Sequence, residues 1–486
     1  MVKRGDAVAG AHEKADRVDR RVALSVTALA AFLTAVMGSS VNVAIPTIGK
    51  EFSVDAITLS WIATAYLLVV AICLVPVGRI ADIHGRKRVF LSGVVGWTVT
   101  SLLCGVATSA PLLIAFRALQ GVAGAMLAGT STAIVTSVYP PRERGHALGI
   151  NVAAVYTGLA VGPFIGGIMT QQLSWRSMFL LNALLGIVIA LLTIIRLKGS
   201  EWTGARGERL DVAGSLIFAA TMLAIMSGLS VLPSVLGGWL ILMGVLGLAA
   251  FVAWEARVPQ PVLNIGLFQH NVVFAMSNLA ALINYVATFA ITFLLSLYLQ
   301  YVKGLDPQTA GMVLLAQPVM MAVFSPLAGR LSDRIEPRIV ASTGMAITTV
   351  GLVMLVFLND GSSLAYIVAA LVVAGFGFAL FSSPNTNAVM SSVERSSLGV
   401  ASATLGVMRA AGQMLSMGIA TLIIAIFVGG VQITPQQHAS FSSGFRLAFV
   451  IFSALCVAGI FSSLARGRVH GELPESRHTE ATSLRR

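Results

Sequence analysis

Charged residues are scarce in this chain. Only 11% of its 486 residues are Asp, Glu, Lys or Arg, against about 25% in a typical soluble domain. Apolar residues make up 56% of the chain, and the mean hydropathy is +0.87. This composition excludes an ordinary soluble domain. Apolar runs of about 20 residues, enough to cross a bilayer as helix, recur along the sequence. We count fourteen of them, which predicts a multi-pass protein embedded in a lipid bilayer.

Cysteine is also rare. Cys73, Cys104 and Cys456 all fall within apolar runs, where cysteine behaves as a small hydrophobic residue. The sequence has no metal-ligand spacing and no disulfide framework, so we expect neither metal nor cofactor. The longest polar stretches are the two tails and a linker near residues 197–210, none of which can bury a core of its own. A membrane enzyme and a membrane sensor with an output domain are therefore both disfavoured.

Basic residues are distributed unevenly. If the N-terminus is cytoplasmic, 26 of the 32 Lys and Arg lie in cytoplasmic tails and loops, and four lie in outer loops. This satisfies the positive-inside rule and predicts that both termini are cytoplasmic. The net charge of +12 is then explained by the orientation of the chain in the membrane, and no nucleic-acid partner is needed to explain it. The first 21 residues are too polar for a signal peptide, so we expect the first run to be an uncleaved span.

A charged hairpin occurs twice. Residues 78–88 read GRIADIHGRKR, and residues 329–338 read GRLSDRIEPR, 251 positions later. Such duplication indicates two related halves, an architecture typical of transporters with a site between the halves. We predict an all-α integral membrane protein with a tail at 1–21, a six-helix bundle at 22–198, a linker with two extra helices at 199–262, a second six-helix bundle at 263–467, and a tail at 468–486.

Six motifs in order resemble the major facilitator superfamily, and within it the fourteen-helix drug:proton antiporters. They are the hairpin at 78–88, residues 139–145 in the next cytoplasmic loop, 117–121 in the fourth run, 158–167 in the fifth, 175–182 at the start of the sixth, and 42–46 at the end of the first. The resemblance implies the major-facilitator fold and a monomeric secondary transporter in the cell membrane. It also implies multidrug or antibiotic efflux by proton antiport, with two bundles rocking about a small amphipathic substrate.

The first hairpin carries candidates for a conformational switch. By resemblance, Asp82 should face the N-terminus of the thirteenth helix, near residues 397–399, in the outward-facing state only. A carboxylate near a helix N-terminus gains roughly 0.3–1 kcal/mol. The alternative is a solvated loop that only sets topology. The candidate switch residues are Gly78, Arg79, Asp82, Gly85, Arg86 and Arg88, with Asp333 and Arg334 in the second half.

The fifth run carries the motif associated with exporters. Gly158, Gly162 and Gly166 recur every four residues on one helix face, which permits close packing. Pro163 predicts a kink, and Gly167 completes the motif. We expect this helix to seal one side of the transporter at the boundary between the halves. Ordinary helix packing is the alternative.

Two arginines, Arg117 and Arg409, fall within apolar runs. An unpaired arginine there costs several kcal/mol, so Arg117, with Gln120 on the same helix face, is a candidate to bind an anion or to assist proton movement. A structural hydrogen bond is the alternative, as it is for Arg409 with Gln413. Uncharged polar residues in the spans either line a central cavity or join helices: Asn42, Tyr66, Tyr156, Asn284, Tyr285, Gln317 and Asn385.

No acidic residue falls near the middle of a run. Members of the family commonly carry an aspartate five positions before the motif at 42–46, where this chain has Met37. A buried carboxylate would hold a proton and attract cations, whereas arginine stays protonated. We therefore expect neutral, zwitterionic or anionic amphiphiles as substrates, and proton coupling remains an implication of the resemblance. The alternative is an exporter or flippase of one native metabolite or lipid, without proton coupling.

Overall fold

A computed structural model describes residues 2–140, 143–197, 211–258, 261, 263, 265–332, 334–394 and 398–467. All regular secondary structure in these residues is helical. Fourteen of their helical segments are long and apolar enough to cross a membrane. The predicted all-α membrane protein with fourteen spans is thus confirmed.

The first eight spans are single helices. They are α1 (Val2–Phe52), α2 (Ala56–His84), α3 (Arg86–Gly105), α4 (Ala110–Val138), α5 (Arg144–Gln172), α6 (Trp175–Arg196), α7 (Val212–Val231) and α8 (Val235–Glu255). A short α9 (Ile265–His270) follows.

Three of the remaining six spans change helix type or break. The ninth span joins α10 (Val272–Thr288), α11 (Ile291–Leu297) and the π-helical η1 (Tyr298–Val302), and the tenth joins α12 (Pro307–Leu314) and α13 (Ala316–Ser332). The last four contain α14 (Pro337–Val356), α15 (Leu364–Ser391), α16 (Leu398–Phe427), and the 3₁₀-helical η3 (Pro435–Gln437) with α17 (His438–Ala465).

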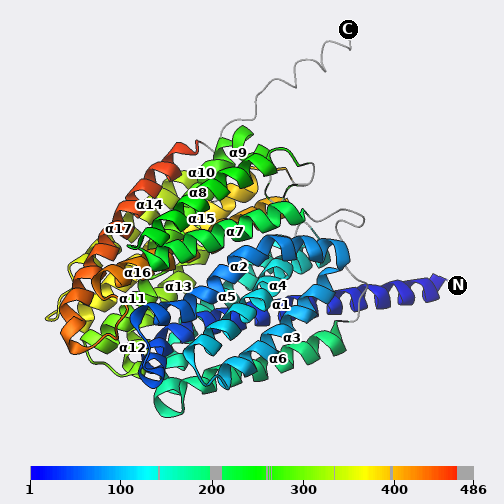
Figure 1. Cartoon of the computed structure of the whole chain (residues 1–486). Helices are drawn as coiled ribbons and strands as arrows, with labels where there is room; N and C mark the ends of the chain where they lie inside the picture. Colours follow the sequence, from blue (N-terminus) through cyan, green and yellow to red (C-terminus); the bar gives the residue numbers. More distant parts are fainter. Residues whose placement is uncertain are drawn as a thin grey trace, which may run out of the picture.

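The helices pack in the same pattern in the two parts of the chain. In the first part α1 packs on α5, α2 packs on α4, and α3 packs on both α4 and α6. In the second part α10 packs on α16, α13 packs on α15, and α14 packs on both α15 and α17. Figure 1 shows the two groups side by side, the first coloured from blue to blue-green and the second from green to red. We call them the N-half (α1–α6) and the C-half (α10–α17).

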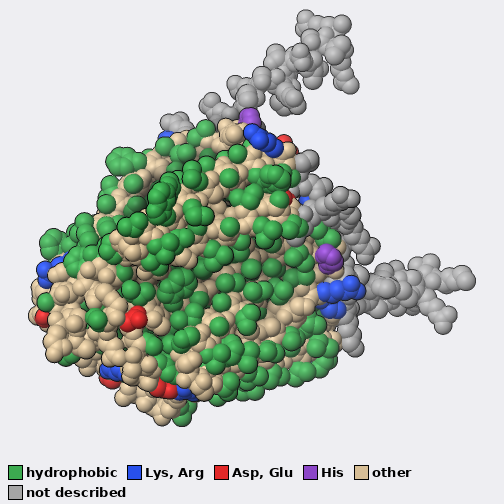
Figure 2. Space-filling view, viewed as in Figure 1, with side chains coloured by type: hydrophobic (Ala, Val, Ile, Leu, Met, Phe, Trp, Pro, Cys, Tyr) green, Lys and Arg blue, Asp and Glu red, His purple; other side chains and the backbone are tan. Residues whose placement is uncertain are grey.

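The two ends of the bundle are named here by their loops. The proximal end carries the N-terminal stretch of α1 and the α2–α3 hairpin; the distal end carries the turn between α1 and α2 and the connection between η1 and α12 (Figure 1). On the face seen in Figure 2, apolar side chains cover the middle and charged side chains gather toward the ends. A bilayer fits this banded surface.

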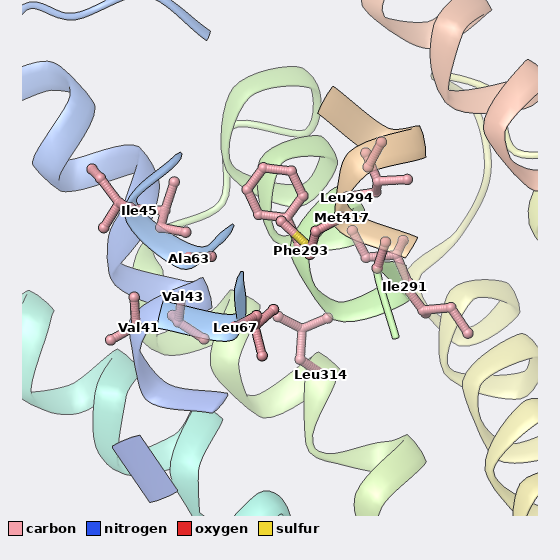
Figure 3. Packing of buried hydrophobic residues seen from close by; sticks show 14 of the residues in the cluster. Val41, Val43, Ile45, Ala63, Leu67, Ile291, Phe293, Leu294, Leu314 and Met417 are labelled. Atoms are coloured by element: carbon pink, nitrogen blue, oxygen red, sulfur yellow. The ribbon is translucent and has the colours of Figure 1, made fainter. Parts of the chain in front are cut away.

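A large buried cluster fills the space where the halves meet. Val41 and Ile45 from α1 and Leu67 from α2 belong to the same cluster as Phe293 from α11 and Leu314 from α12 (Figure 3). Side chains from both halves therefore form one continuous core.

The two extra helices lie on the flank of this junction. Helix α7 packs against both α2 of the N-half and α16 of the C-half, and α8 packs on α7. Phe218 of α7 shares a buried cluster with Leu68 of α2 and Val407 of α16. The insertion thus covers the seam between the halves on one side.

Candidate functional site

At the distal end, side chains of the C-half donate hydrogen bonds to backbone carbonyls of α1. Pro46 has no N–H, so the carbonyl of Asn42 lacks its helical donor four residues on. The Ser296 hydroxyl donates to that oxygen at 2.6 Å. Gln300 donates its amide N–H to the next carbonyl, Val43, at 2.9 Å. The turn of α1 that precedes Pro46 is thus bonded directly to the other half.

Further contacts close the distal end elsewhere. Thr421 of α16 donates to the Ser60 hydroxyl of α2 at 2.9 Å. The Ala56 N–H bonds to the carbonyl of Val431 at 3.1 Å. Helix α5 also packs closely on α12. The halves therefore meet at this end through α1, α2 and α5 of the N-half and α11, η1, α12 and α16 of the C-half.

The glycines of α5 face two different neighbours. A Cβ at Gly158 would lie 2.6 Å from the carbonyl oxygen of Phe32, and one at Gly166 would lie 2.8 Å from Ser40. Gly162 likewise abuts α1, and Ser40 donates to its carbonyl at 2.7 Å. These three glycines pack α5 onto α1 within the N-half.

Gly167 and Pro163 instead face the C-half. A Cβ at Gly167 would lie 2.6 Å from the carbonyl oxygen of Pro307 in α12, and a Cβ at Gly311 would overlap the carbonyl of Pro163. Gly167 and Pro163 thus contact the other half, whereas Gly158, Gly162 and Gly166 face α1. The predicted role in sealing one side therefore concerns these two positions rather than the glycine face.

A central cluster joins the halves midway along the helices. Tyr156 of α5 and Ser382 of α15 share a hydrogen bond of 2.8 Å. Tyr156 packs with Met321 of α13 and Phe378 of α15. Tyr285 of α10 meets Phe378 edge to face, with 5.5 Å between ring centroids. Two of the predicted cavity residues, Tyr156 and Tyr285, are thus brought together from opposite halves.

Arg409 lies beside this cluster. Gly412, three residues on, lets α16 approach α10 so closely that a Cβ there would lie 2.8 Å from the Cβ of Tyr285. The Arg409 guanidinium consequently lies over the Tyr285 ring, 5.8 Å from its centroid. It also donates to the Thr386 hydroxyl at 2.7 Å. Its Nε is buried without a hydrogen-bond partner.

Arg117 lies elsewhere, inside the N-half. It is 2% exposed, donates to the side-chain oxygen of Gln120 and donates to the carbonyl of Ile62 at 3.2 Å. Gln120 in turn donates to the Ser101 hydroxyl at 2.8 Å. Tyr66 places its ring 4.5 Å from the guanidinium carbon. Arg117 and Gln120 lie on one face of α4, as the sequence predicted. That face packs against α2 and α3.

The other predicted cavity residues are dispersed. The carbonyl oxygen of Asn42 accepts the hydrogen bond from Ser296 that links the halves at the distal end. Asn284 of α10 is fully buried, and neither polar atom of its amide has a hydrogen-bond partner. Gln317 is buried in α13. Asn385 donates to the Ser277 carbonyl at 3.1 Å.

Asn385 also belongs to a cluster that the sequence did not reveal, centred on Arg466. This arginine is fully buried and donates to the side-chain oxygen of Asn385 at 2.9 Å, to the carbonyl of Pro337 at 3.1 Å and to the Ser463 hydroxyl at 3.0 Å. Burial lowers the pKa of Arg466 to about 10. An arginine just past an apolar run has the pattern of a topology signal, so no sequence feature indicated its burial.

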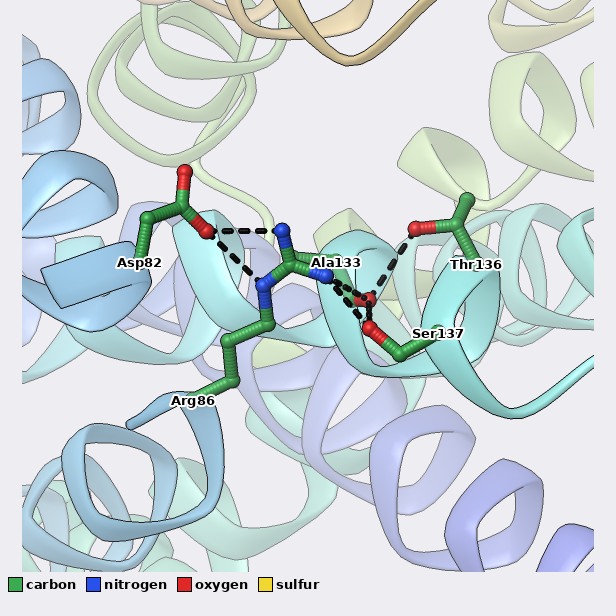
Figure 4. Close-up of polar contacts among 5 residues, drawn as sticks. All are labelled: Asp82, Arg86, Ala133, Thr136 and Ser137. Carbon is green, nitrogen blue, oxygen red and sulfur yellow. Dashed lines mark hydrogen bonds and ion pairs between the residues drawn. The ribbon is translucent and has the colours of Figure 1, made fainter. Parts of the chain in front are cut away.

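At the proximal end the first hairpin is closed within the N-half. Arg86 binds the Asp82 carboxylate at 2.7 Å, and it donates to the carbonyl of Ala133 at 3.1 Å and to the Ser137 hydroxyl (Figure 4). Gly85 separates the two helices with φ of 116°, a conformation that L side chains rarely adopt.

Asp82 thus contacts its own half in this structure. A Cβ at Gly399, near the start of α16, would meet no atom within 4 Å, and the same holds at Gly78. Arg79 and Arg88 have partners as well. Arg334 lies in the turn after α13, and Asp333 lies outside the described residues.

Nothing in the described part of the chain resembles a metal site: it has no group of three or more His, Cys, Asp or Glu side chains placed to hold an ion. A family model for the Major Facilitator Superfamily matches residues 27–259 and 278–485. The chain belongs to the Major Facilitator Superfamily. It is a transporter, and the prediction that it is not an enzyme is confirmed.

Its relatives in this superfamily are named for different substrates. The chain is 28% identical over 446 residues to riboflavin transporter RibZ of Clostridioides difficile (strain 630), covering 90% of this chain and 96% of RibZ. It is 30% identical over 423 residues to multidrug resistance protein Stp of Mycobacterium tuberculosis (strain CDC 1551 / Oshkosh), covering 85% of this chain and 77% of Stp.

Among solved structures, a bacterial homologue of the human lysosomal transporter Spinster, in an inward-facing and unoccupied conformation, has the same fold. It superposes with a TM-score of 0.67 at 17% identity, covering 92% of this chain and 97% of that one. The resemblance found in the motifs is therefore confirmed at the level of superfamily and fold.

Proposed function

We propose that this transporter exports amphipathic small molecules by alternating access of its two halves. The observation that carries the proposal is the pattern of contacts between them. Hydrogen bonds and close helix packing join the halves at the distal end. A cluster with side chains from both halves lies midway, and Asp82 is paired within its own half at the proximal end. In a rocker-switch mechanism, contacts of this kind between the halves form in one conformation and break in the other.

The proposal includes a division of the chain. Residues 22–198 and 263–467 form the moving bundles, and 199–262 hold the insertion, while 1–21 and 468–486 form tails. The repeated packing pattern supports two equivalent bundles. With 26 of 32 basic residues on one side, we assign the proximal end and both termini to the cytoplasm, in the cell membrane. The closed distal end is then extracellular, so this structure is in an inward-facing arrangement. The protein works as a monomer.

The switch and seal follow from this assignment. Asp82 leaves Arg86 for the N-terminus of α16 when the proximal end closes, and the other hairpin residues support that exchange. Gly167 and Pro163 open and close against α12. Tyr156, Tyr285 and Arg409 form the substrate site.

Proton antiport is part of the proposal, and it rests on the resemblance of the sequence motifs to those of the drug:proton antiporters. Acids in the described spans lie near helix ends, as Glu51, Asp82 and Glu255 do. A coupling proton therefore has no mid-membrane carboxylate to occupy. We assign the passage of the proton to Arg117 and Gln120, a polar pair in the N-half.

Transport of one native metabolite is the second candidate. The relative that favours it is the riboflavin transporter RibZ, which matches 90% of this chain. A narrow substrate range would distinguish it from multidrug export.

Everted membrane vesicles containing the protein test the proposal. An acid-inside gradient is imposed, and amphiphiles of different charge are added one at a time while a pH-sensitive dye reports the lumen. We expect a substrate to trigger proton release, and Arg117→Ala to abolish that release. Substrate flux without proton release would contradict antiport but leave export standing. No flux of any compound would contradict export.

A further inference from the structure

We propose that Arg409 binds an acidic group of the transported molecule, so that amphiphiles carrying a carboxylate or a similar anion are the preferred substrates. The inference rests on the proposed export function and names the chemical class that its central site selects.

Arg409 lacks a counter-ion. In the described part of the chain its polar partners are the neutral Thr386 hydroxyl at 2.7 Å and the face of the Tyr285 ring at 5.8 Å. Neither offsets a full positive charge within a membrane span. Its Nε is buried and has no acceptor, although guanidinium offers five N–H donors. An anion placed here would supply the missing acceptor and neutralise the charge.

The polar groups beside Arg409 also lack partners. Gln413 lies one turn further on the same face of α16, is half-buried, and makes no hydrogen bond to the described residues. The Tyr285 hydroxyl is likewise without one in that part of the chain. Amide and phenol groups next to a guanidinium can all donate to one carboxylate. A cationic substrate would meet a fixed positive charge at this place.

An apolar cluster adjoins Tyr285. Phe378 meets Tyr285 edge to face, and Met321 and Tyr156 pack with Phe378. Aromatic and methionine side chains accommodate flat apolar ligands of varied shape. The site therefore combines one cationic corner with an adaptable hydrophobic surface, which suits an amphipathic anion.

Arg117 provides a contrast within the same protein. It is more deeply buried, but the side-chain oxygen of Gln120 and the carbonyl of Ile62 accept from it. It also lies within the N-half, away from side chains of the C-half. Arg409 instead lies over the ring of Tyr285, which packs in one cluster with Tyr156 of the N-half, and its buried Nε has no acceptor.

Three radiolabelled probes with one ring system separate charge from shape: 2-naphthoate, 2-naphthamide and 2-naphthylmethylammonium. Their transport is compared in proteoliposomes containing the unaltered protein, Arg409→Gln, Arg409→Lys or the control Arg196→Gln, which removes a charge at the exposed end of α6. We expect naphthoate to have the lowest KM. Arg409→Gln should raise the naphthoate KM about tenfold or more without changing that of naphthamide, Arg409→Lys should recover part of the difference, and Arg196→Gln should change neither.

An equal effect of Arg409→Gln on naphthoate and naphthamide would overturn the proposal, because it would indicate a structural role. So would a preference of the unaltered protein for the amide or the ammonium compound, although export would then stand. If the unaltered protein moves none of the three, export of amphiphiles itself fails, and the assignment of Arg409 fails with it.

Discussion

Ser296 donates a hydrogen bond to the carbonyl oxygen of Asn42 across the junction of the two halves, at 2.6 Å. Pro46 explains why that oxygen is free, because a proline four residues on cannot provide the helical N–H. The proline inside α1 thus leaves free the acceptor that the C-half uses. The contact lies at the distal end, so the proposed rocking motion would break it when that end opens.

Removing the Ser296 hydroxyl should therefore weaken distal closure. Ser296→Ala leaves a buried carbonyl without a donor, at a cost of about 1–3 kcal/mol. We expect a population with a longer distance between spin labels at positions 109 and 436, which are exposed at the distal ends of the two halves. Pulsed electron resonance measures that distance distribution.

Pro46→Ala provides the matched control. It restores an N–H that can bond to the Asn42 carbonyl within α1, so Ser296→Ala should have a smaller effect in that background. Equal effects of Ser296→Ala with and without Pro46 would contradict this account of the contact.

A second prediction concerns locking the halves together. Ser60 and Thr421 have hydroxyls 2.9 Å apart on opposite halves, whereas Ser342 and Ser463 have hydroxyls 2.9 Å apart within the C-half. After the native cysteines are replaced, paired cysteines at 60 and 421 should form a disulfide that stops transport, and reduction should restore it. A disulfide between 342 and 463 should leave transport intact. Transport that survives cross-linking of 60 to 421 would exclude a rocking motion that opens this seam.

The sequence predicted the helix count and the superfamily but not the distal seal. Apolar runs and motifs are local, so fourteen spans could be counted without any tertiary information. Ser296 and Asn42 are 254 positions apart, and no pattern joins them. Arg117 and Arg409 also looked alike, each with a glutamine one turn on. Which of them lies beside the cluster that joins the halves depends on how each helix is rotated about its axis, and packing decides that.

Asp82 should matter for cycling rather than for folding. Its pair with Arg86 is partly exposed, with side-chain exposures of 30% and 19%, and ion pairs near the surface contribute about 0–1 kcal/mol to stability. We expect Asp82→Asn to insert and express normally but to transport several-fold more slowly, because the neutral side chain gains little at the α16 N-terminus. Initial transport rates at matched protein levels measure this, with Glu394→Gln as the control at an exposed proximal position. Full transport by Asp82→Asn would remove the switch from the mechanism.

Gly167 should set how closely α5 approaches α12. A methyl group there would lie 2.6 Å from the Pro307 carbonyl oxygen, a distance that requires the helices to separate. We expect Gly167→Ala to open the distal end in the same spin-label measurement and to lower the transport rate. Gly149→Ala, on the same helix but with no atom within 4 Å of the added methyl, should change neither. An unchanged label distance in Gly167→Ala would show that the contact does not hold the halves together.

Arg466 should stabilise the C-half without taking part in transport. Its guanidinium joins α17 to Asn385 of α15 and to Pro337 of α14, and its loss leaves these buried acceptors without donors. Because each such acceptor costs about 1–3 kcal/mol, we expect Arg466→Met to lower the free energy of unfolding by about 3 kcal/mol. Denaturant titration in detergent, followed by the near-ultraviolet signal, measures this, and Arg196→Met serves as the exposed control. A substrate KM that changed in Arg466→Met while the unfolding midpoint stayed constant would instead place this arginine in the transport path.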